Sequence, residues 1–253
     1  VVLGDPIEHS LSPVIHNAGL AAAGLMGEYT RRRVDAVGMA AAVEEIRNGA
    51  LSGANVTMPH KELATELCDR TSVLAARAGA VNTLVRSGRA VVGHNTDVVG
   101  IQNAWREAHL PTSAPVLVLG SGGAAAAALL ALEDRELFVA ARRPDVIDDL
   151  CRRVGVTAVP VDWAAPVDGA VVVNATPLGM KGEALDEAVL APAGGLFDMA
   201  YASAPTPAVR DLAARGLPTV DGRRMLLHQA AAAFELWTGH KAPLAAMDAA
   251  LGM

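Results

Sequence analysis

Short apolar runs alternate with alanine-rich stretches in the first hundred residues of the chain. The runs are bounded by glycine, proline or asparagine, which predicts strands, while apolar residues at helical spacing follow Pro13 and Pro59 and recur around residues 39–48. This alternation predicts one α/β unit that ends near Asn95. Its expected strands lie in VVLG, EYTRRRV, SGANVT, GAVNTLV and AVVGHN.

A second α/β unit follows a connecting helix, expected in VVGIQNAWREAHL because Val98, Ile101 and Trp105 recur at helical spacing. APVLVLG is continuously apolar, as in a parallel strand covered on both faces, and ELFVAA, GAVVVN and GGLFDMAY repeat that character. The segments between them are long enough for crossover helices. We therefore expect a doubly wound parallel sheet over about residues 99–222, then one long buried helix in MLLHQAAAAFELWTG that stops at Gly239.

Length and charge limit the class of protein. The 253 residues suffice for roughly one to two domains. A net charge of -6 leaves no global basic field, so neither nucleic acid nor membrane is an expected partner. The stretch between Glu107 and Glu133 carries no formal charge, but Pro111, Pro115 and three glycines interrupt it. A strand, turn and helix explain it better than a membrane span.

The cysteines and histidines indicate neither a disulfide framework nor a metal site. Cys68 and Cys151 are far apart and outside any CxxC spacing, which fits a reducing, cytoplasmic setting. The seven histidines show no ligand spacing such as HExxH. We therefore expect no metal.

A glycine-rich turn directly after APVLVLG has the pattern of a dinucleotide-binding loop. GSGGAA has the form GxGxxA, in which the first glycine permits a tight turn, the second lets backbone approach a pyrophosphate, and the alanine allows close helix packing. The amides at the start of the following helix would hold the phosphates. The alternative is an ordinary glycine turn that opens a helix. The candidate cofactor-binding residues are Gly120, Ser121, Gly122, Gly123 and Ala124.

Arg142 and Arg143 end the next strand, where a site for NAD usually carries an acidic residue. Guanidinium groups can hold a ribose 2′-phosphate through two hydrogen bonds each, which favours NADP. The pair could instead be solvated at a strand end, and Asp145 keeps NAD use possible.

Lys61 is the candidate proton-transfer residue. Pro59 suits the first position of a helix, which would place Lys61 in the first turn, where the partially positive helix end disfavours the ammonium form. A general base must be able to lose its proton, so this effect suits Lys61 to that role. A nearby carboxylate such as Asp97 would instead favour the ammonium form and orient the amine. Alternatively, Lys61 is a surface lysine, and Asp97 or Thr96 caps the helix that follows.

Further polar residues stand where a polyhydroxylated ligand could use them. Ser12, followed by proline, could be the N-cap of a helix, but that does not account for Ser10. Asn82 and Gln229 are amides in an apolar strand and a buried helix, where each needs a ligand or another hydrogen-bond partner. Tyr201 ends a strand, at the carboxyl edge where open α/β sheets bind ligands.

In their order along the chain, these motifs resemble the shikimate dehydrogenase family over nearly the whole length. GDPIEHSLSPVIHN resembles the family's opening motif, NVTMPHK and AGAVNTL its substrate wall, and GHNTDVVG the segment with its aspartate. GSGGAA, NATPLGM, FDMAY and MLLHQAAAAFELWTG follow in the family's order. The resemblance implies a substrate-binding catalytic domain over residues 1–97, a Rossmann-type NADP domain over residues 98–222, and a C-terminal helical segment, residues 223–253, that packs on the substrate domain.

The resemblance also implies an activity: NADP-dependent, reversible reduction of 3-dehydroshikimate to shikimate, in the pathway to chorismate and the aromatic amino acids. The enzyme would be a cytoplasmic monomer or homodimer. Lys61 would transfer the hydroxyl proton, paired with Asp97, and no metal is required. Ser10, Ser12 and Tyr201 would hold the substrate carboxylate, Asn55, Thr57, Lys61, Asn82, Asp97 and Gln229 would form the rest of the substrate site, and Thr176, Met199 and Gly222 would line the nicotinamide side.

Two positions depart from the family pattern, and two alternatives stay open. AARRPDVI lacks the asparagine and the later arginine that often follow the second strand, and Arg224, beside Arg223, stands where a glycine is usual. A relative that prefers quinate or NAD is the close alternative, although the second serine of HSLS argues for shikimate, because quinate-using relatives can carry threonine there. The other alternative is a non-catalytic nucleotide-binding sensor, which would not need both Lys61 and Asp97.

Overall fold

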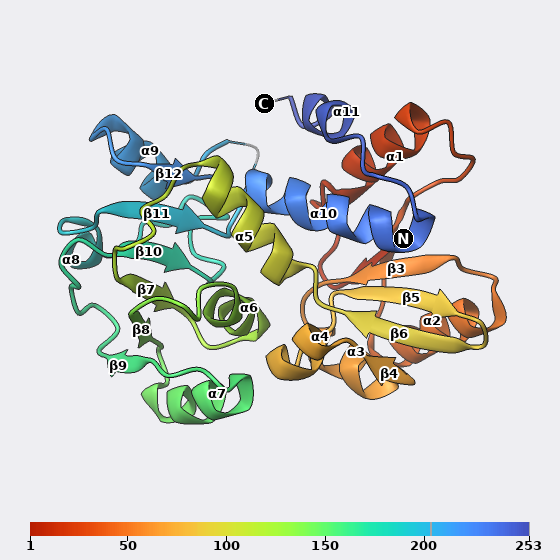
Figure 1. Cartoon of the computed structure of the whole chain (residues 1–253), viewed down its shortest axis with the longest axis horizontal. Coiled ribbons are helices and arrows are strands. Elements are labelled where there is room, and N and C mark those ends of the chain that lie inside the picture. Colours follow the sequence, from red (N-terminus) through yellow and green to blue (C-terminus); the bar gives the residue numbers. More distant parts are fainter. Residues whose placement is uncertain (203, 253) are drawn as a thin grey trace. The chain divides into compact units, whose positions relative to one another are not determined.

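A computed structural model describes residues 1–202 and 204–252 and divides the chain into two compact units. Unit 1 comprises residues 1–100 and 226–253, and unit 2 comprises residues 101–225. The chain leaves unit 1 within helix α5 (Asp97–Glu107) and returns to it within helix α10 (Gly222–Thr238) (Figure 1).

Unit 1 contains a mixed six-stranded sheet in the order β2-β1-β3-β5-β6-β4. Strand β5 runs antiparallel to both of its neighbours, and the other pairs are parallel. The sequence-based expectation of an α/β unit here is therefore confirmed. The strands are β1 (Val2–Gly4), β2 (Arg31–Arg33), β3 (Gly53–Val56), β4 (Arg70–Thr71), β5 (Thr83–Ser87) and β6 (Ala90–His94).

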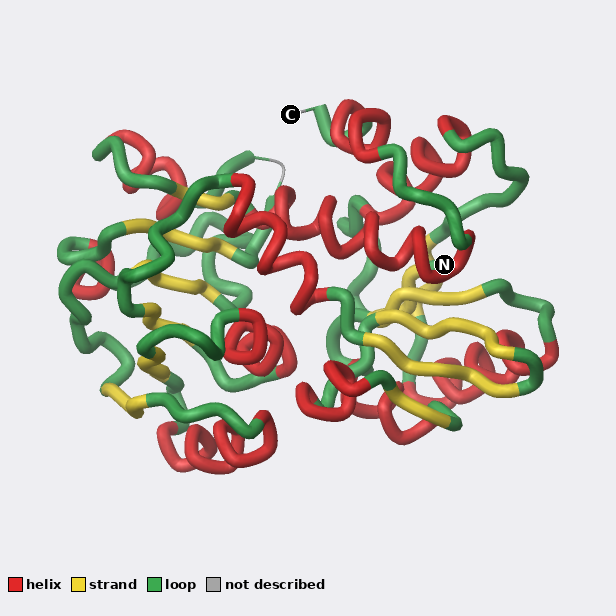
Figure 2. Tube along the Cα trace, in the orientation of Figure 1, coloured by secondary structure: helices red, strands yellow, loops and turns green. Residues whose placement is uncertain are grey.

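Helices cover both faces of this sheet. Successive side chains of a strand point to opposite faces, so neighbouring residues of β1 contact different helices. Leu3 belongs to a buried core with residues of the helices α2, α3 and α4, whereas its neighbour Val2 packs with Tyr29 and with Trp237 of α10. Figures 1 and 2 show the same two layers, with α1, α10 and α11 opposite α2, α3 and α4. The helices are α1 (Ser12–Ala22), α2 (Ala36–Asn48), α3 (Lys61–Leu67), α4 (Val73–Ala78) and α11 (Leu244–Ala249).

Unit 2 contains a six-stranded sheet, in the order β12-β11-β10-β7-β8-β9, in which every pair is parallel. The strand order reverses between β7 and β10, which is the point where such sheets bind ligands beyond the carboxyl ends of their strands. The expected doubly wound parallel sheet is confirmed. The strands are β7 (Val116–Leu119), β8 (Leu137–Ala140), β9 (Val159–Val161), β10 (Val171–Asn174), β11 (Gly195–Asp198) and β12 (Thr219–Val220).

Helices also pack on both faces of the second sheet. Leu196 lies in a buried core with residues of α8 and α9, while its neighbour Phe197 stacks on Trp105 of α5 with ring centroids 6.1 Å apart. The helices are α6 (Gly123–Ala131), α7 (Ile147–Val154), which a 3-10 turn at Pro144–Val146 precedes, α8 (Glu187–Leu190) and α9 (Pro207–Ala214).

Some local predictions were wrong. Pro59 is not the first residue of a helix: the His60 carbonyl accepts the first helical bond, from Ala64, so that α3 begins at Lys61. Ser12 is not an N-cap, because Leu11 holds that position and its carbonyl accepts the first bonds of α1. The short elements β4, β9, β12 and α11 were not anticipated, since two to six residues carry too little periodicity.

Candidate active site

The polar residues predicted in unit 1 gather at one edge of its sheet. The parallel strands β1 and β3 end at this edge, the antiparallel strand β5 begins there, and β6 returns to it. Each of these strand ends continues into a segment with predicted site residues. Ser10 lies in the loop after β1 and Ser12 begins α1. Thr57 directly follows β3, Asn82 directly precedes β5, and Asp97 follows β6.

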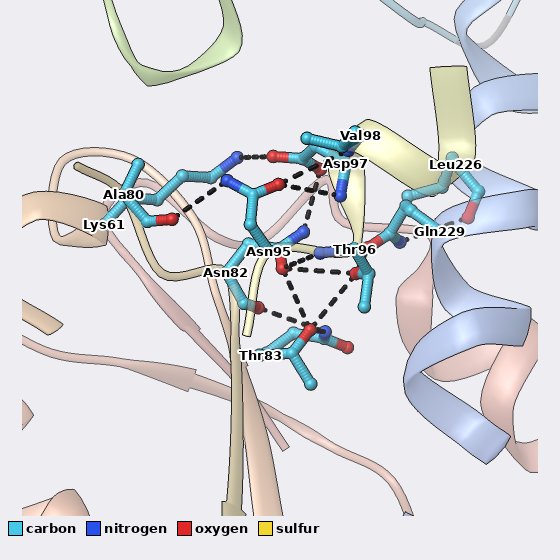
Figure 3. A network of polar contacts seen from close by, with 11 residues as sticks. Lys61, Ala80, Asn82, Thr83, Asn95, Thr96, Asp97, Val98, Leu226 and Gln229 are labelled. Carbon is cyan, nitrogen blue, oxygen red and sulfur yellow. Dashed lines mark hydrogen bonds and ion pairs between the residues drawn. The ribbon is translucent and has the colours of Figure 1, made fainter. Parts of the chain in front are cut away.

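Lys61 and Asp97 belong to a network of polar contacts at this edge (Figure 3). Lys61 Nζ donates to Asp97 Oδ2 at 2.6 Å, and Asn82 Nδ2 donates to Asp97 Oδ1 at 2.8 Å. The Asp97 side chain is 7% exposed, whereas that of Lys61 is 21% exposed. A buried carboxylate with both oxygens engaged therefore holds an amine that a ligand can still reach, so Lys61 is not an ordinary surface lysine.

The side chain that stabilises the start of α5 is that of Asn95, which sequence reasoning missed. Its Oδ1 accepts from the amides of Asp97 and Val98 at 3.1 and 3.3 Å, and its Nδ2 donates to the carbonyl of Ala80. The carboxylate of Asp97 is thereby left to Lys61 and Asn82. The alternative in which Asp97 serves as the helix cap is not the arrangement found.

Backbone contacts determine which way the two buried amides point. The Thr96 amide, which can only donate, lies 2.8 Å from Asn82 Oδ1, so the nitrogen of Asn82 faces Asp97. The Leu226 carbonyl, which can only accept, lies 3.1 Å from Gln229 Nε2, and Thr96 Oγ1 donates to Gln229 Oε1 at 3.4 Å. Each amide nitrogen keeps one N–H without a partner among the described residues. Asn82 and Gln229 can therefore each donate one hydrogen bond to a ligand.

Asn55 is fully engaged as a donor. Its Nδ2 donates to the Asn82 carbonyl at 3.2 Å and to Thr83 Oγ1 at 3.0 Å, and its Oδ1 accepts from the hydroxyl of Tyr29 at 2.6 Å. Thr83 in turn donates to Asn82 Oδ1. For a ligand, Asn55 retains only a second lone pair on Oδ1, so its predicted contact with substrate stays a prediction.

The serines of HSLS lie together in a buried position. Ser10 Oγ accepts from the Ser12 amide at 3.3 Å and donates to Ser12 Oγ at 3.2 Å, while the Ser10 carbonyl accepts from Nε and Nη2 of Arg31. The hydroxyl hydrogen of Ser12 has no acceptor among the described residues. Thr57, half-buried, likewise keeps its hydroxyl available within the described part of the chain. These hydroxyls can bind an anionic or hydroxylated ligand.

In unit 2, GSGGAA connects β7 to α6 with the conformation that the motif predicts. Gly120 has φ +123°, and a Cβ there would lie 2.9 Å from the Ala175 carbonyl oxygen, so only glycine fits. A Cβ on Gly122 would meet no protein atom within 4 Å, which leaves open space beside the turn. Ala126 is the first residue of α6 whose amide is bonded, so among the described residues the amides of Gly123 and Ala124 remain free for a phosphate.

Arg142 and Arg143 follow β8 and are exposed. Neither guanidinium has a hydrogen bond or ion pair with another described residue. Both are therefore able to hold a phosphate group on this edge of the unit 2 sheet, and neither has a structural role that would compete with it.

The residues predicted beside the nicotinamide follow strands of the unit 2 sheet: Thr176 and Met199 lie in loops, and Gly222 is the first residue of α10. Asn174 Oδ1 accepts from the amide and the hydroxyl of Thr176 at 3.1 and 2.6 Å. A Cβ on Gly222 would lie 2.4 Å from the Ala200 carbonyl and 2.9 Å from that of Met199, so α10 begins against the segment after β11. Tyr201 lies three residues after β11 and is partly exposed.

Comparison with known proteins identifies the family. The profile of the shikimate dehydrogenase substrate binding domain matches residues 2–84, and that of the shikimate 5'-dehydrogenase C-terminal domain matches residues 222–251. The shikimate dehydrogenase (NADP(+)) of Acidiphilium cryptum is 41% identical over 246 residues, covering 94% of this chain and 89% of that protein. The chain belongs to the shikimate dehydrogenase family.

Solved structures of family members agree with the fold. The shikimate 5-dehydrogenase of Thermus thermophilus, in complex with NADP(H) and shikimate, is 35% identical with a TM-score of 0.90, covering 99% of this chain and 97% of that one. The shikimate dehydrogenase of Mycobacterium tuberculosis is 34% identical with a TM-score of 0.85, over the same two shares. Both the resemblance to the family and the α/β fold class expected from the sequence are thus confirmed.

Arg224, which departs from the family pattern, and its neighbour Arg223 have partners within unit 2. Arg224 pairs with Glu107 at the end of α5, with Nε 3.0 Å from Oε2, and Arg223 pairs with Asp221.

Over residues 1–202 and 204–252, no three histidine, cysteine or acidic side chains are arranged to hold a metal ion. In the same ranges, no helix combines the length and apolarity needed to cross a membrane.

Sequence reasoning found the residues that can contact a ligand but missed those that hydrogen-bond to them and fix their orientation. Tyr29, Thr83 and Asn95 are examples in unit 1, and Asn174 and Asp198 in unit 2. A usable signal was present for the last two, because a polar residue ends an otherwise apolar strand in GAVVVN and in GGLFD.

Proposed function

We propose that this chain catalyses the reversible reduction of 3-dehydroshikimate to shikimate, with Lys61 and Asp97 as the proton-transfer pair. As a family member it is an NADP-dependent oxidoreductase that acts on a CH–OH group, in the biosynthesis of aromatic amino acids. The 2.6 Å contact between Lys61 Nζ and Asp97 Oδ2, at an accessible sheet edge with unused donors, carries the assignment of the pair.

Lys61 handles the proton of the reacting hydroxyl. In the oxidation of shikimate, the neutral amine removes this proton, and in the reverse direction the ammonium returns it to the ketone oxygen. Asp97 accepts a hydrogen bond from the amine and keeps it in one orientation. Because Asn82 and Lys61 bind different oxygens of this carboxylate, rotation of Asp97 would break a bond on each side.

The remaining donors at this edge suit a hydroxylated acid. The unused N–H groups of Asn82 and Gln229 would donate to ring hydroxyl oxygens, and the Ser12 hydroxyl would donate to the substrate carboxylate. The Ser10 hydroxyl would donate there too, once its hydrogen turns away from Ser12 Oγ. A site that hydrogen-bonds its ligand in this way discriminates strongly against analogues without the matching group, since its buried donors would be left unpaired.

NADP, when bound, supplies or accepts the hydride, which leaves to the chain only binding, orientation and proton transfer. We propose that the loop from Gly120 to Ala124 holds the pyrophosphate, since the amides of Gly123 and Ala124 are free and Gly122 leaves open space. Arg142 and Arg143 would hold the 2′-phosphate.

Other predictions extend this proposal. Residues 1–97 with 223–253 would be the substrate domain and residues 98–222 the NADP domain, in a cytoplasmic monomer or homodimer. Tyr201 would contact the substrate carboxylate, so a Tyr201→Phe variant should raise KM for shikimate more than KM for NADP.

The test is a matrix of initial rates on the purified protein, with shikimate or quinate crossed against NADP or NAD. Lys61→Ala is compared with Lys241→Ala, a matched removal of an exposed lysine beyond α10. We expect turnover with shikimate and NADP, and loss of kcat by about 10²- to 10⁴-fold in Lys61→Ala alone, the range for a general acid or base. Calorimetry should show that Lys61→Ala still binds shikimate.

The other outcomes are distinct. Turnover mainly with quinate and NAD would assign the chain to the quinate-preferring relatives, and no turnover with any pair would favour a nucleotide-binding sensor. Equal kcat in Lys61→Ala and the wild type would remove Lys61 from proton transfer while leaving the substrate assignment intact.

A further inference from the structure

Asp198, the last residue of β11, is a fully buried carboxylate to which neither proton transfer nor substrate binding assigns a role. Its Oδ1 accepts from Asn174 Nδ2 at 2.8 Å and from the Ala200 amide at 3.0 Å, and its Oδ2 accepts from Thr206 Oγ1 at 2.5 Å. A buried carboxylate is costly unless such donors compensate it. These three hydrogen bonds therefore stabilise the carboxylate and, in turn, tie their donors to the end of β11.

The three bonds join three segments of unit 2. Asn174 ends β10, and its own Oδ1 binds the amide and hydroxyl of Thr176 at 3.1 and 2.6 Å. The Ala200 amide belongs to the residue directly after Met199, and Thr206 caps α9 through the Val209 amide. Asp198 is thus linked by one hydrogen bond to the residue after Met199 and by two, through Asn174, to Thr176.

We propose that Asp198 is a positioning residue for the nicotinamide end of the cofactor site, acting through Asn174 on Thr176 and through the Ala200 amide on Met199. The proposal rests on the function proposed above. Asp198 itself touches neither cofactor nor substrate. Its negative charge is what allows one side chain to accept from all three segments at once.

The direction of these hydrogen bonds explains why charge matters. Two donors meet at Oδ1, so any hydrogen added to the carboxyl group must sit on Oδ2 and point at Thr206. The bond to Thr206 then reverses, and the bonds at Oδ1 become neutral, whereas bonds to an ionised acceptor are roughly twice as strong. The side-chain amide of an Asp198→Asn variant would be arranged in the same way, with its nitrogen toward Thr206. This variant therefore imitates the protonated state at every pH.

The protonated state is within experimental reach. Burial raises the pKa of Asp198 to about 6, nearby Asp221 also raises it, and the bonds from Thr206, Ala200 and Asn174 lower it. Asp221 is itself paired with Arg223. As pH falls through about 6, Asp198 takes up a proton, and its hydrogen bonds to Asn174 and to the Ala200 amide weaken.

The experiment compares kcat/KM for NADP, at saturating shikimate, in wild type and Asp198→Asn from pH 5 to pH 8. We expect the variant to lose about tenfold at pH 8, equivalent to ~1.4 kcal/mol, and nothing at pH 5. The ratio of wild type to variant cancels titration of the cofactor's own 2′-phosphate, whose pKa is also about 6. A ratio that stays constant across this range would overturn the proposal.

Two further variants separate positioning from stability. Leu212→Ala removes a buried side chain of α9 without touching any of these bonds, and should lower Tm while leaving the pH profile unchanged. Thr206→Val removes one bond that lowers the pKa of Asp198, so the inflection should move to higher pH. An unmoved inflection, or the same profile change in Leu212→Ala, would contradict the proposal even if Asp198→Asn does not fold.

Failure of the proposed function would look different. If the wild type binds NADPH, seen by nucleotide fluorescence, but does not turn over shikimate, the reaction assignment fails. The ratio of NADPH dissociation constants, measured over the same pH range, would then still test Asp198.

Discussion

His16 should make unit 1 sensitive to acid. The side chain is 1% exposed, and neither ring nitrogen has a hydrogen-bond partner among the described residues. Its ring stacks on Tyr29 at 4.3 Å, with planes 15° apart, and lies 5.1 Å from the ring of Trp237. Burial lowers the pKa of His16 from 6.5 to about 3. Between these two pH values the folded protein keeps the ring neutral, while the ring in the unfolded chain takes up a proton.

The sign and size of the effect follow from this difference in pKa. Above pH 6.5 the ring is neutral in both states, and stability is at its full value. As pH falls below 6.5 the unfolded state binds more protons, so stability is lost progressively until about pH 3, where the folded state is protonated too. Between pH 7.5 and pH 5, linkage with these two values predicts a loss of about 2 kcal/mol in the free energy of unfolding.

The assay is urea unfolding at pH 7.5 and pH 5, followed by the emission of Trp237 in a Trp105→Phe/Trp163→Phe background. The chain has three tryptophans, so this background leaves one reporter, in contact with His16 itself. His16→Phe keeps an aromatic ring that needs no partner, and any packing strain it adds is the same at both pH values. Titration of other groups, Asp198 among them, cancels in the comparison.

We expect the wild type to lose about 2 kcal/mol more than His16→Phe between the two pH values. Equal losses would show that the His16 ring is protonated in the folded state or reaches water, and would refute the reasoning from its burial.

Three further predictions follow from the geometry. Thr83→Val leaves a buried amide N–H without its acceptor, so urea unfolding should show a loss of about 1 to 3 kcal/mol that Thr83→Ser does not; identical stabilities would contradict the donor assignment. Gly120→Ala should lower Tm, because the added Cβ would meet the Ala175 carbonyl. Gly122→Ala should leave Tm unchanged and raise KM for NADP about tenfold, because the added Cβ would fill space proposed for the pyrophosphate. An unchanged KM in Gly122→Ala would place the cofactor elsewhere. Replacing Arg142 and Arg143 together by alanine should raise KM for NADP about tenfold or more and leave KM for NAD unchanged, and a parallel rise in both would argue against a 2′-phosphate contact.

Elements with a long, regular pattern were predictable from the sequence, and short ones were not. The helix in MLLHQAAAAFELWTG was expected to stop at Gly239, and α10 ends at Thr238, directly before Gly239, which has φ +67°. A buried helix repeats its apolar face over several turns, which makes it predictable. Its first residue, Gly222, was not anticipated to be helical. The start of α3 was misplaced for a related reason: Pro59 fits a first helical turn, but the loop after β3 extends to His60.

The residues that gather at the candidate site could be predicted from the sequence, but the hydrogen bonds between them could not. Lys61, Asn82, Asp97 and Gln229 could be singled out because each is a polar residue in an apolar setting and the motifs resemble one family. Neither property says which atom bonds to which. A reader of the sequence would have made Asp97 a helix cap as readily as the partner of Lys61, and only the position of Asn95 decides between them.

The sequence by itself determined the class of fold, the glycine-rich turn after β7 and the residue types available for chemistry, because hydrophobic periodicity and glycine conformation are local properties of the chain. The tertiary structure decided the rest. It brought the ends of β1, β3 and β6 and the start of β5 to one edge, and it gave the buried side-chain amide of Asn82 a direction by placing the Thr96 backbone amide beside it. One hydrogen bond of the site, between the side chains of Thr96 and Gln229, joins residues 133 positions apart, and no local pattern carries that information.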